Sequence, residues 1–266
     1  TLFRSRLTGE SIGQARHNRR KSLAQYYAAA SHIDEGVGRI LDELSAQDLL
    51  DETLIVYTAD HGLNCGHHGI WGKGNATRPL NMLEESIRIP MIFNCPGNRD
   101  FDGAIVNEPM KPKRHDGWVF GAQVRQEFVD HTDLFATLLD YADVSLPDTA
   151  AHTYPGRSLR ALVQDARGVT DWRDAQYAEF GPVRMIRTQR YKLVLREPLG
   201  HNELYDLVSD PRERQNIYAE TAPIVVTLRE QLEAFFAEHS HPERDGRRAA
   251  EQRQHNYVEA WRGEMD

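Results

Sequence analysis

The sequence predicts an α/β domain followed by a small antiparallel sheet with a helix. Residues 1–172 contain a helix pattern, two apolar strand patterns separated by a glycine-rich loop, and a second helix pattern. That order is typical of layered α/β folds. Residues 173–238 change to short alternating runs and a final helix pattern, which indicates a small antiparallel sheet. Residues 239–266 form a charged tail.

The first helix is predicted over residues 22–45, where apolar side chains recur with helical spacing. The stripe indicates an amphipathic helix with one apolar face. Its members are Leu23, Tyr26, Tyr27, Ala30, Ile33, Val37, Ile40, Leu41 and Leu44.

Two strands are predicted next, over residues 53–59 and 89–95. The near-continuous apolar character of the first favours a parallel strand covered on both faces. Pro90 is expected at the start of the second strand, where a missing backbone donor is tolerated. After a long loop over residues 97–122, Asp130 is expected to cap a helix. The apolar residues of that helix are Leu134, Phe135, Leu138, Leu139 and Ala142.

The C-terminal sheet is predicted from short runs of alternating polarity separated by turn residues. The four runs are residues 176–180, 183–188, 191–195 and 203–207. A helix is expected to start near Pro223, because proline is favoured in a first helical turn. Its apolar face consists of Val225, Leu228, Leu232, Phe235 and Phe236.

Composition narrows the class of protein. With 266 residues the chain can bury one substantial core, and its formal charge of −8 argues against a nucleic-acid scaffold. Two cysteines, Cys65 and Cys95, give no disulfide framework, and no apolar run reaches the length of a membrane span. The chain begins at Thr1 rather than methionine, which indicates a processed or incomplete chain.

The stretch with the most chemistry is residues 58–75, a glycine-rich loop at the end of the first predicted strand. Ligands collect at such strand ends in open α/β sheets. The carboxylate of Asp60 and the imidazole of His61 can supply two ligands to a divalent cation. The alternative is that Asp60 caps the turn and His61 is an ordinary loop histidine.

The same loop carries a lysine and two further histidines. Lys73 lies between two glycines, and its compact ammonium suits a tetrahedral oxyanion. His67 and His68 are candidates as metal ligands or substrate donors, or are an exposed polar pair.

The ordered series of motifs resembles the second half of a type I, formylglycine-dependent sulfatase of the alkaline phosphatase superfamily. The resemblance covers residues 22–237. It rests on the helix before the first strand, Asp60-His61-Gly62, Gly66–Lys73, Asn81–Pro90, Pro155–Leu159, Arg187–Leu193 and Glu203–Glu213.

The resemblance implies an alkaline-phosphatase-like α/β/α sandwich, present in part, that hydrolyses a sulfuric ester of a carbohydrate. It implies that Asp60 and His61 bind one divalent cation, usually calcium. Magnesium, manganese and zinc are alternatives, because calcium prefers oxygen ligands. Lys73 would bind a sulfate oxygen and stabilise charge as the ester bond breaks. His68 would contact the substrate or protonate the leaving group.

The family's nucleophile, a formylglycine within Cys/Ser-x-Pro/Ala-x-Arg, is not found in this chain. Cys95 does not qualify, because Pro96 follows it directly. We therefore expect a C-terminal portion of a longer enzyme, inactive without the missing N-terminal portion. By resemblance, the enzyme is expected to be periplasmic or secreted.

Two alternatives remain open. A phosphodiester or phosphonate monoester hydrolase of the same superfamily is favoured by His61 and the His67-His68 pair, and disfavoured by Lys73 in its Gly-Trp-Gly-Lys setting. A non-catalytic fragment that binds sulfated glycans is the second alternative. Candidates to line the substrate pocket are Arg114, His115, Trp118 and Arg184.

Overall fold

The computed structural model describes residues 18–77, 80–94, 124–146, 154–164, 169–197 and 200–251. The chain divides into two compact units. The first consists of Thr1–Thr77, Glu85–Gln126 and Asn256–Asp266, and the second of Arg78–Glu84 and Glu127–His255. The domain boundary predicted after residue 172 stays a prediction. Among the helices of the described ranges, none combines the length and the hydropathy that a membrane span needs.

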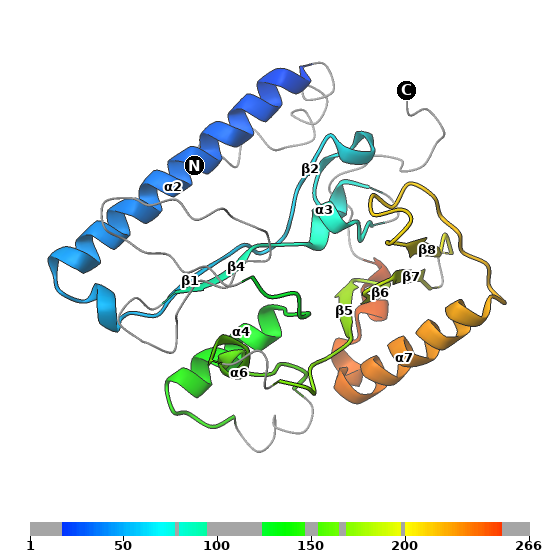
Figure 1. The fold of residues 1–266 in the computed structure, drawn as a ribbon. Helices are drawn as coiled ribbons and strands as arrows, with labels where there is room; N and C mark the ends of the chain where they lie inside the picture. The colour runs from blue at the N-terminus through cyan, green and yellow to red at the C-terminus, as the bar shows by residue number, and fades with distance from the viewer. Residues whose placement is uncertain are drawn as a thin grey trace. The chain divides into compact units, whose positions relative to one another are not determined.

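The described part of the first unit contains a long helix, followed by short strands and turns (Figure 1). Its elements are α2 (Arg19–Ala46), η1 (Leu50–Glu52), β1 (Ile55–Thr58), β2 (Asn64–Cys65), η2 (His67–Gly69), β3 (Trp71–Gly72), η3 (Gly74–Ala76) and β4 (Met91–Asn94). The four-residue helix α3 (Glu84–Ile87) starts on the last residue of the second unit's segment 78–84.

Helix α2 matches the predicted helix, and the Asn18 side chain caps it by accepting from the Lys21 backbone N–H. None of its residues is buried. Tyr26, Ile33 and Ile40, which are seven residues apart and share a face, are 46%, 53% and 62% exposed. The predicted apolar stripe is therefore largely uncovered.

The direction predicted for the first strand is wrong. Strand β1 pairs with β4 in antiparallel register, Val56 opposite Phe93 and Thr58 opposite Met91. Strand β4 therefore runs back along β1. A continuous apolar run does not fix the direction of the neighbouring strand. The predicted cover on both faces is also not seen in the described residues, because no residue of β1 is buried and Tyr57 is 40% exposed. Phe93 and Met91 form a buried part of this unit.

The second unit contains the predicted sheet and helix. Strands β5 (Ala175–Phe180), β6 (Val183–Thr188), β7 (Tyr191–Arg196) and β8 (Glu203–Asp206) form one antiparallel sheet in sequence order. Helix α7 (Pro223–His239) packs on it (Figure 1). The shared core consists of Ala175, Ile186, Leu193, Leu195, Leu204, Val225, Leu228 and Leu232. The remaining elements are α4 (His131–Tyr141), α6 (Arg160–Gln164), η4 (Pro242–Arg244) and η5 (Gly246–Glu251).

The two positively charged side chains of strand β7 are buried. Lys192 and Arg196 are fully buried. The Lys192 ammonium donates to the Met82 carbonyl at 2.7 Å and to Glu84 Oε1 at 3.0 Å, and it contacts the buried Glu213. Arg196 donates to the Leu80 carbonyl at 3.1 Å. The segment 80–84 is thus held by charge-assisted hydrogen bonds from one strand.

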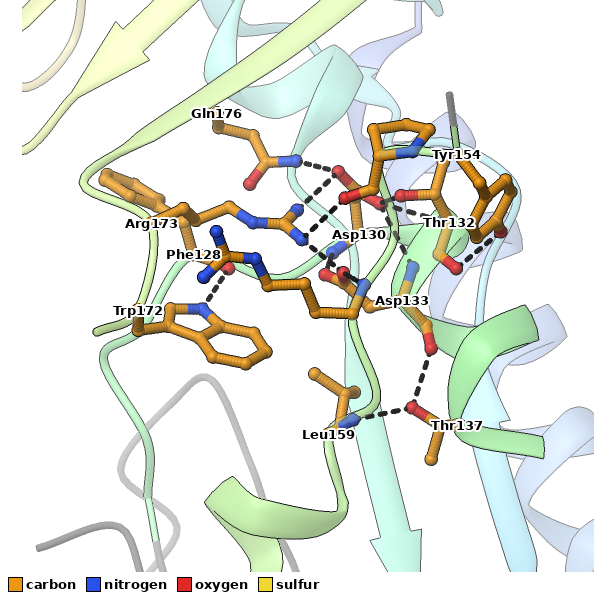
Figure 2. Close-up of polar contacts among 12 residues, drawn as sticks. Phe128, Asp130, Thr132, Asp133, Thr137, Tyr154, Leu159, Trp172, Arg173 and Gln176 are labelled. Carbon is orange, nitrogen blue, oxygen red and sulfur yellow. Dashed lines mark hydrogen bonds and ion pairs between the residues drawn. The ribbon is translucent and has the colours of Figure 1, made fainter. Parts of the chain in front are cut away.

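Helix α4 begins with a polar network that ties it to later segments of the same unit (Figure 2). Asp130 caps the helix as predicted, accepting from the Thr132 N–H at 2.8 Å. The buried Asp133 pairs with Arg173 and accepts from the Arg157 N–H at 2.8 Å. Thr137 accepts from the Leu159 N–H at 2.8 Å. The buried positions of α4 therefore include polar Asp133 and Thr137, whereas the apolar Phe135 and Leu138 are exposed.

Candidate functional site

The turn after β1 presents Asp60 and His61. The Asp60 side chain is 85% exposed, and its Oδ1 accepts from the His61 N–H at 3.0 Å. The Thr58 hydroxyl donates to the Pro90 carbonyl at 2.8 Å and fixes the end of the strand. A fixed strand end therefore presents an exposed carboxylate.

The imidazole of His61 is held in one tautomer. Its Nδ1 lies 2.8 Å from the Gly62 carbonyl, and its Nε2 lies 2.9 Å from Lys73 Nζ. A carbonyl can only accept and an ammonium can only donate, so Nδ1 carries the hydrogen and Nε2 presents a lone pair. Asp60 Oδ2 lies 3.4 Å from the same Nε2. A carboxylate, an imidazole lone pair and an ammonium thus converge on one point.

Gly62 sets how closely this turn approaches α3. A Cβ at this position would lie 2.2 Å from the Glu85 carbonyl oxygen and 3.0 Å from that of Arg88. The Gly62 N–H donates to the Ser86 carbonyl at 2.9 Å. Glycine is required here because the two backbones touch. The Asp60-His61 turn is therefore fixed against α3.

Lys73 follows the short strand β3, which pairs with β2. The preceding residue, Gly72, has a φ of +156°, and a Cβ there would lie 2.6 Å from the Ala76 Cβ. The glycine lets the chain turn tightly, so that the Lys73 side chain reaches His61.

The histidine pair lies on the turn η2. The His68 side chain is 4% exposed, and its Nε2 lies 3.8 Å from Glu85 Oε2. His67 is 45% exposed, and its Nδ1 lies 3.3 Å from Glu85 Oε1. His68 has left-handed backbone angles, φ 54° and ψ 23°, which are uncommon for a residue with a side chain. The exposed polar pair considered above thus describes His67 but not His68.

The donor set fits a cation at Nε2 of His61. The Lys73 ammonium is itself a cation on that lone pair, and the Gly62 carbonyl orients the imidazole as it would for a metal ligand. Asp60 adds an exposed carboxylate oxygen. Across the part of the chain that the structure describes, no group of three or more acidic, histidine or cysteine side chains is gathered for a metal. The described residues therefore supply two protein ligands, one nitrogen and one oxygen.

Of the four residues expected to line the substrate pocket, the structure describes one, Arg184. Arg184 is 8% exposed and is bound by Glu179 at 2.7 Å and Asp245 at 3.0 Å, so its charge is used within the second unit. The candidates Arg114, His115 and Trp118, and also Cys95, lie outside the described residues. Sequence reasoning missed Glu85, although it is an acidic residue within the Asn81–Pro90 motif.

The sequence model of the sulfatase family matches residues 6–144, and that of "N-sulphoglucosamine sulphohydrolase, C-terminal" matches residues 106–238. The chain belongs to the sulfatase family.

Two of the similar proteins are sulfatases by name. An arylsulfatase of Clostridium perfringens is 31% identical over 74% of this chain and 36% of its own length. An N-acetylglucosamine-6-O-sulfatase of Bacteroides thetaiotaomicron is 30% identical over 74% of this chain and 32% of its own length. The chain thus spans about a third of the length of these curated relatives.

A solved structure confirms the predicted fold. A protein in complex with its substrate D-glucosamine-2-N,6-O-disulfate aligns with a TM-score of 0.63 and 29% identity, over 83% of this chain and 41% of that protein. The chain therefore has the alkaline-phosphatase-like α/β fold in part, with the small C-terminal antiparallel sheet and helix.

Proposed function

We propose that this chain is part of a sulfatase in which Asp60 and His61 bind a divalent cation and Lys73 binds the sulfate group. The observation that carries the proposal is the approach of Lys73 Nζ to 2.9 Å from His61 Nε2, with Asp60 Oδ2 at 3.4 Å from the same nitrogen. Three groups from two turns meet where a cation and an anion can be held side by side.

Each side chain has a defined role. Lys73, once its ammonium turns from His61 to a sulfate oxygen, stabilises the charge that develops as the ester bond breaks. His68, the second candidate substrate contact, donates a proton to the departing alcohol oxygen. Asp60 and His61 hold the cation, which supplies Lewis-acid polarisation of the sulfate when bound. We propose calcium, with magnesium, manganese or zinc as alternatives, because one of the two ligands is a nitrogen.

The nucleophile is proposed to come from another portion of the same enzyme. The chain spans about a third of its curated relatives, and its own Cys95-Pro96 segment does not fit the formylglycine motif. The exposed stripe of α2, Tyr26, Ile33 and Ile40, is consistent with a surface that such a portion covers. The chain alone is then expected to show negligible turnover.

The proposed substrate is a sulfated carbohydrate, a proposal supported by the relatives. One acts by name on N-acetylglucosamine-6-O-sulfate, and another was solved with a glucosamine disulfate. Export to the periplasm or the outside of the cell is a further proposal, which the family resemblance supports and cell fractionation tests.

The direct test measures hydrolysis of N-acetylglucosamine-6-sulfate by the enzyme that contains this chain together with the nucleophile-bearing portion. Lys73→Met is expected to lower kcat by about 10²- to 10³-fold, as loss of a group that stabilises developing charge does. Lys21→Met, at an exposed lysine in the first turn of α2, is the matched control and is expected to leave kcat unchanged. An equal effect of the two variants would contradict the proposal.

The phosphonate monoester alternative is favoured by one observation, the nitrogen ligand at His61. Comparing kcat/KM for a sulfate ester and a phosphonate monoester, with metal analysis of the purified enzyme, separates the two. A higher value for the phosphonate would favour the alternative. Binding of a sulfated glycan without turnover by the complete enzyme would favour a non-catalytic role.

A further inference from the structure

We infer that Glu85 is the positioning residue of this site, joining the turn that carries His61 to the turn that carries His68. The inference deepens the proposed function and rests on it for the chemical role of His68. It rests on geometry for the role of Glu85. All residues involved belong to the first unit.

The backbone of Glu85 contacts the first turn. Its carbonyl oxygen lies where a Cβ on Gly62 would be only 2.2 Å away, and the next residue, Ser86, accepts from the Gly62 N–H at 2.9 Å. The Asn64 side chain also donates to the Ser86 hydroxyl at 2.5 Å. These contacts fix the start of α3 against the residue that follows His61.

The side chain of Glu85 contacts the second turn. Its two oxygens lie 3.3 Å from His67 Nδ1 and 3.8 Å from His68 Nε2. In the described part of the chain, Glu85 Oε2 is buried without a hydrogen-bond partner. A buried carboxylate oxygen without a hydrogen bond is costly, and a protonated His68 would satisfy it. Glu85 therefore favours the imidazolium form of His68.

The conformation of His68 is consistent with this role. Gly66 and Gly69 on either side also have positive φ values, 93° and 69°, for which glycine is the favoured residue. A histidine in the left-handed region is strained, because its Cβ approaches the backbone more closely there than in its ordinary conformation. Surrounding contacts must hold such a residue in place. The pair formed by Glu85 and His68 is such a contact.

The consequence is a fixed spacing between two chemical groups. The backbone of Glu85 contacts the turn that carries His61, and its side chain contacts His68, the candidate proton donor. Among the described contacts, the Glu85 carboxylate from α3 lies 3.8 Å from His68 Nε2 and 3.3 Å from Nδ1 of the neighbouring His67. Loss of the carboxylate should therefore change the protonation of His68.

The test is an NMR titration of the histidine side chains of this chain, which needs no catalytic activity. Glu85→Gln keeps the shape and removes the charge, and it is expected to lower the pKa of His68 by about 1, the effect of losing a nearby opposite charge. Glu85→Asp, with the carboxylate one methylene further back, is expected to give an intermediate pKa. The shorter acid also provides a second reading if the glutamine variant is poorly folded.

The chain offers a matched control. His32 and Glu35 on α2 form an exposed pair 3.9 Å apart, with side chains 86% and 71% exposed. Glu35→Gln should leave the pKa of His68 unchanged, and Glu85→Gln should leave that of His32 unchanged.

The two ideas fail separately. An unchanged His68 pKa in both Glu85 variants would overturn the positioning role. A changed pKa, together with no sulfate-ester hydrolysis by the complete enzyme, would overturn only the proposed function.

Discussion

The buried ammonium of Lys192 makes the sharpest stability prediction. Its partners Glu84 and Glu213 have side chains that are 18% and 0% exposed. Substituting Lys192→Met keeps much of the volume of the lysine stem and removes the charge. A buried ion pair that loses one partner typically costs about 3–5 kcal/mol, because the remaining charge stays in a dry environment. Arg187 still reaches Glu84, so the cost arises mainly at Glu213.

The loss should depend on pH in a defined direction. Burial raises the pKa of Glu213, against the opposing effect of Lys192. Burial also raises the pKa of Glu84, but Lys192 and Arg187 outweigh it and lower the value overall. Without Lys192 both carboxyl groups hold protons more tightly in the folded state. A carboxyl group whose pKa is raised by folding stabilises the folded state at low pH, and this stabilisation is lost as the pH rises. The loss of unfolding free energy in Lys192→Met should therefore become smaller toward pH 5.

The assay is urea denaturation combined with hydrogen exchange of peptides from β6 and β7, which assigns the loss to the second unit. Arg190→Met on the neighbouring turn is the control, since Arg190 is 59% exposed in its pair with Asp206 and should contribute little. Adding Glu213→Gln to Lys192→Met should recover part of the stability. The reasoning is refuted if Lys192→Met costs no more than Arg190→Met at pH 7.5, or if its deficit grows as pH falls.

Three further outcomes are expected. Gly62→Ala should destabilise the first unit by about 1–3 kcal/mol in thermal or urea unfolding, because its Cβ would overlap the Glu85 carbonyl. The control Gly36→Ala, inside α2 with open space around it, should instead stabilise the same unit by about 0.5–1 kcal/mol. Burial and the neighbouring Asp130 raise the pKa of Asp133 to about 6, above its unfolded value. Relative to Asp133→Asn, the unfolding free energy should therefore fall by about 1.4 kcal/mol for each unit by which the pH rises between about pH 4 and 6. An unfolding free energy that instead rises with pH would mean that the Arg173 pair dominates. Calorimetric titration of Ca²⁺, Mn²⁺ and Zn²⁺ into the chain should give heat that Asp60→Asn abolishes, whereas persistence of the same heat would place the cation elsewhere.

The C-terminal sheet could be predicted from the sequence because its strands are consecutive and its turns are short. Alternation marked each strand, and the apolar face of α7 at Val225, Leu228 and Leu232 matched the core that the structure shows. Such local periodicity depends only on neighbours in the chain. The sequence also singled out His61 and Lys73, which lie on one short glycine-rich loop, although it did not predict their direct contact.

Features set by distant partners could not be predicted. Lys192 and Arg196 occupy the polar face of an alternating strand, which ordinarily faces water, yet a segment more than a hundred residues earlier covers them. Periodicity reports which residues share a face and not what covers that face. Asp133 on α4 is buried for the same reason, because Arg157 and Arg173 bind it from later segments. The antiparallel direction of β1 likewise depends on β4.

The attachment of residues 80–84 to β7 has a consequence for biosynthesis. Met82 leaves the ribosome 110 residues ahead of Lys192, its carbonyl's eventual partner. During that interval the nascent chain carries Met82 and Leu83, which are 3% and 1% exposed in the folded protein, before β7 has been made. Translation products that stop before β7 should therefore be held by chaperones or degraded, whereas those that reach α7 can complete the unit.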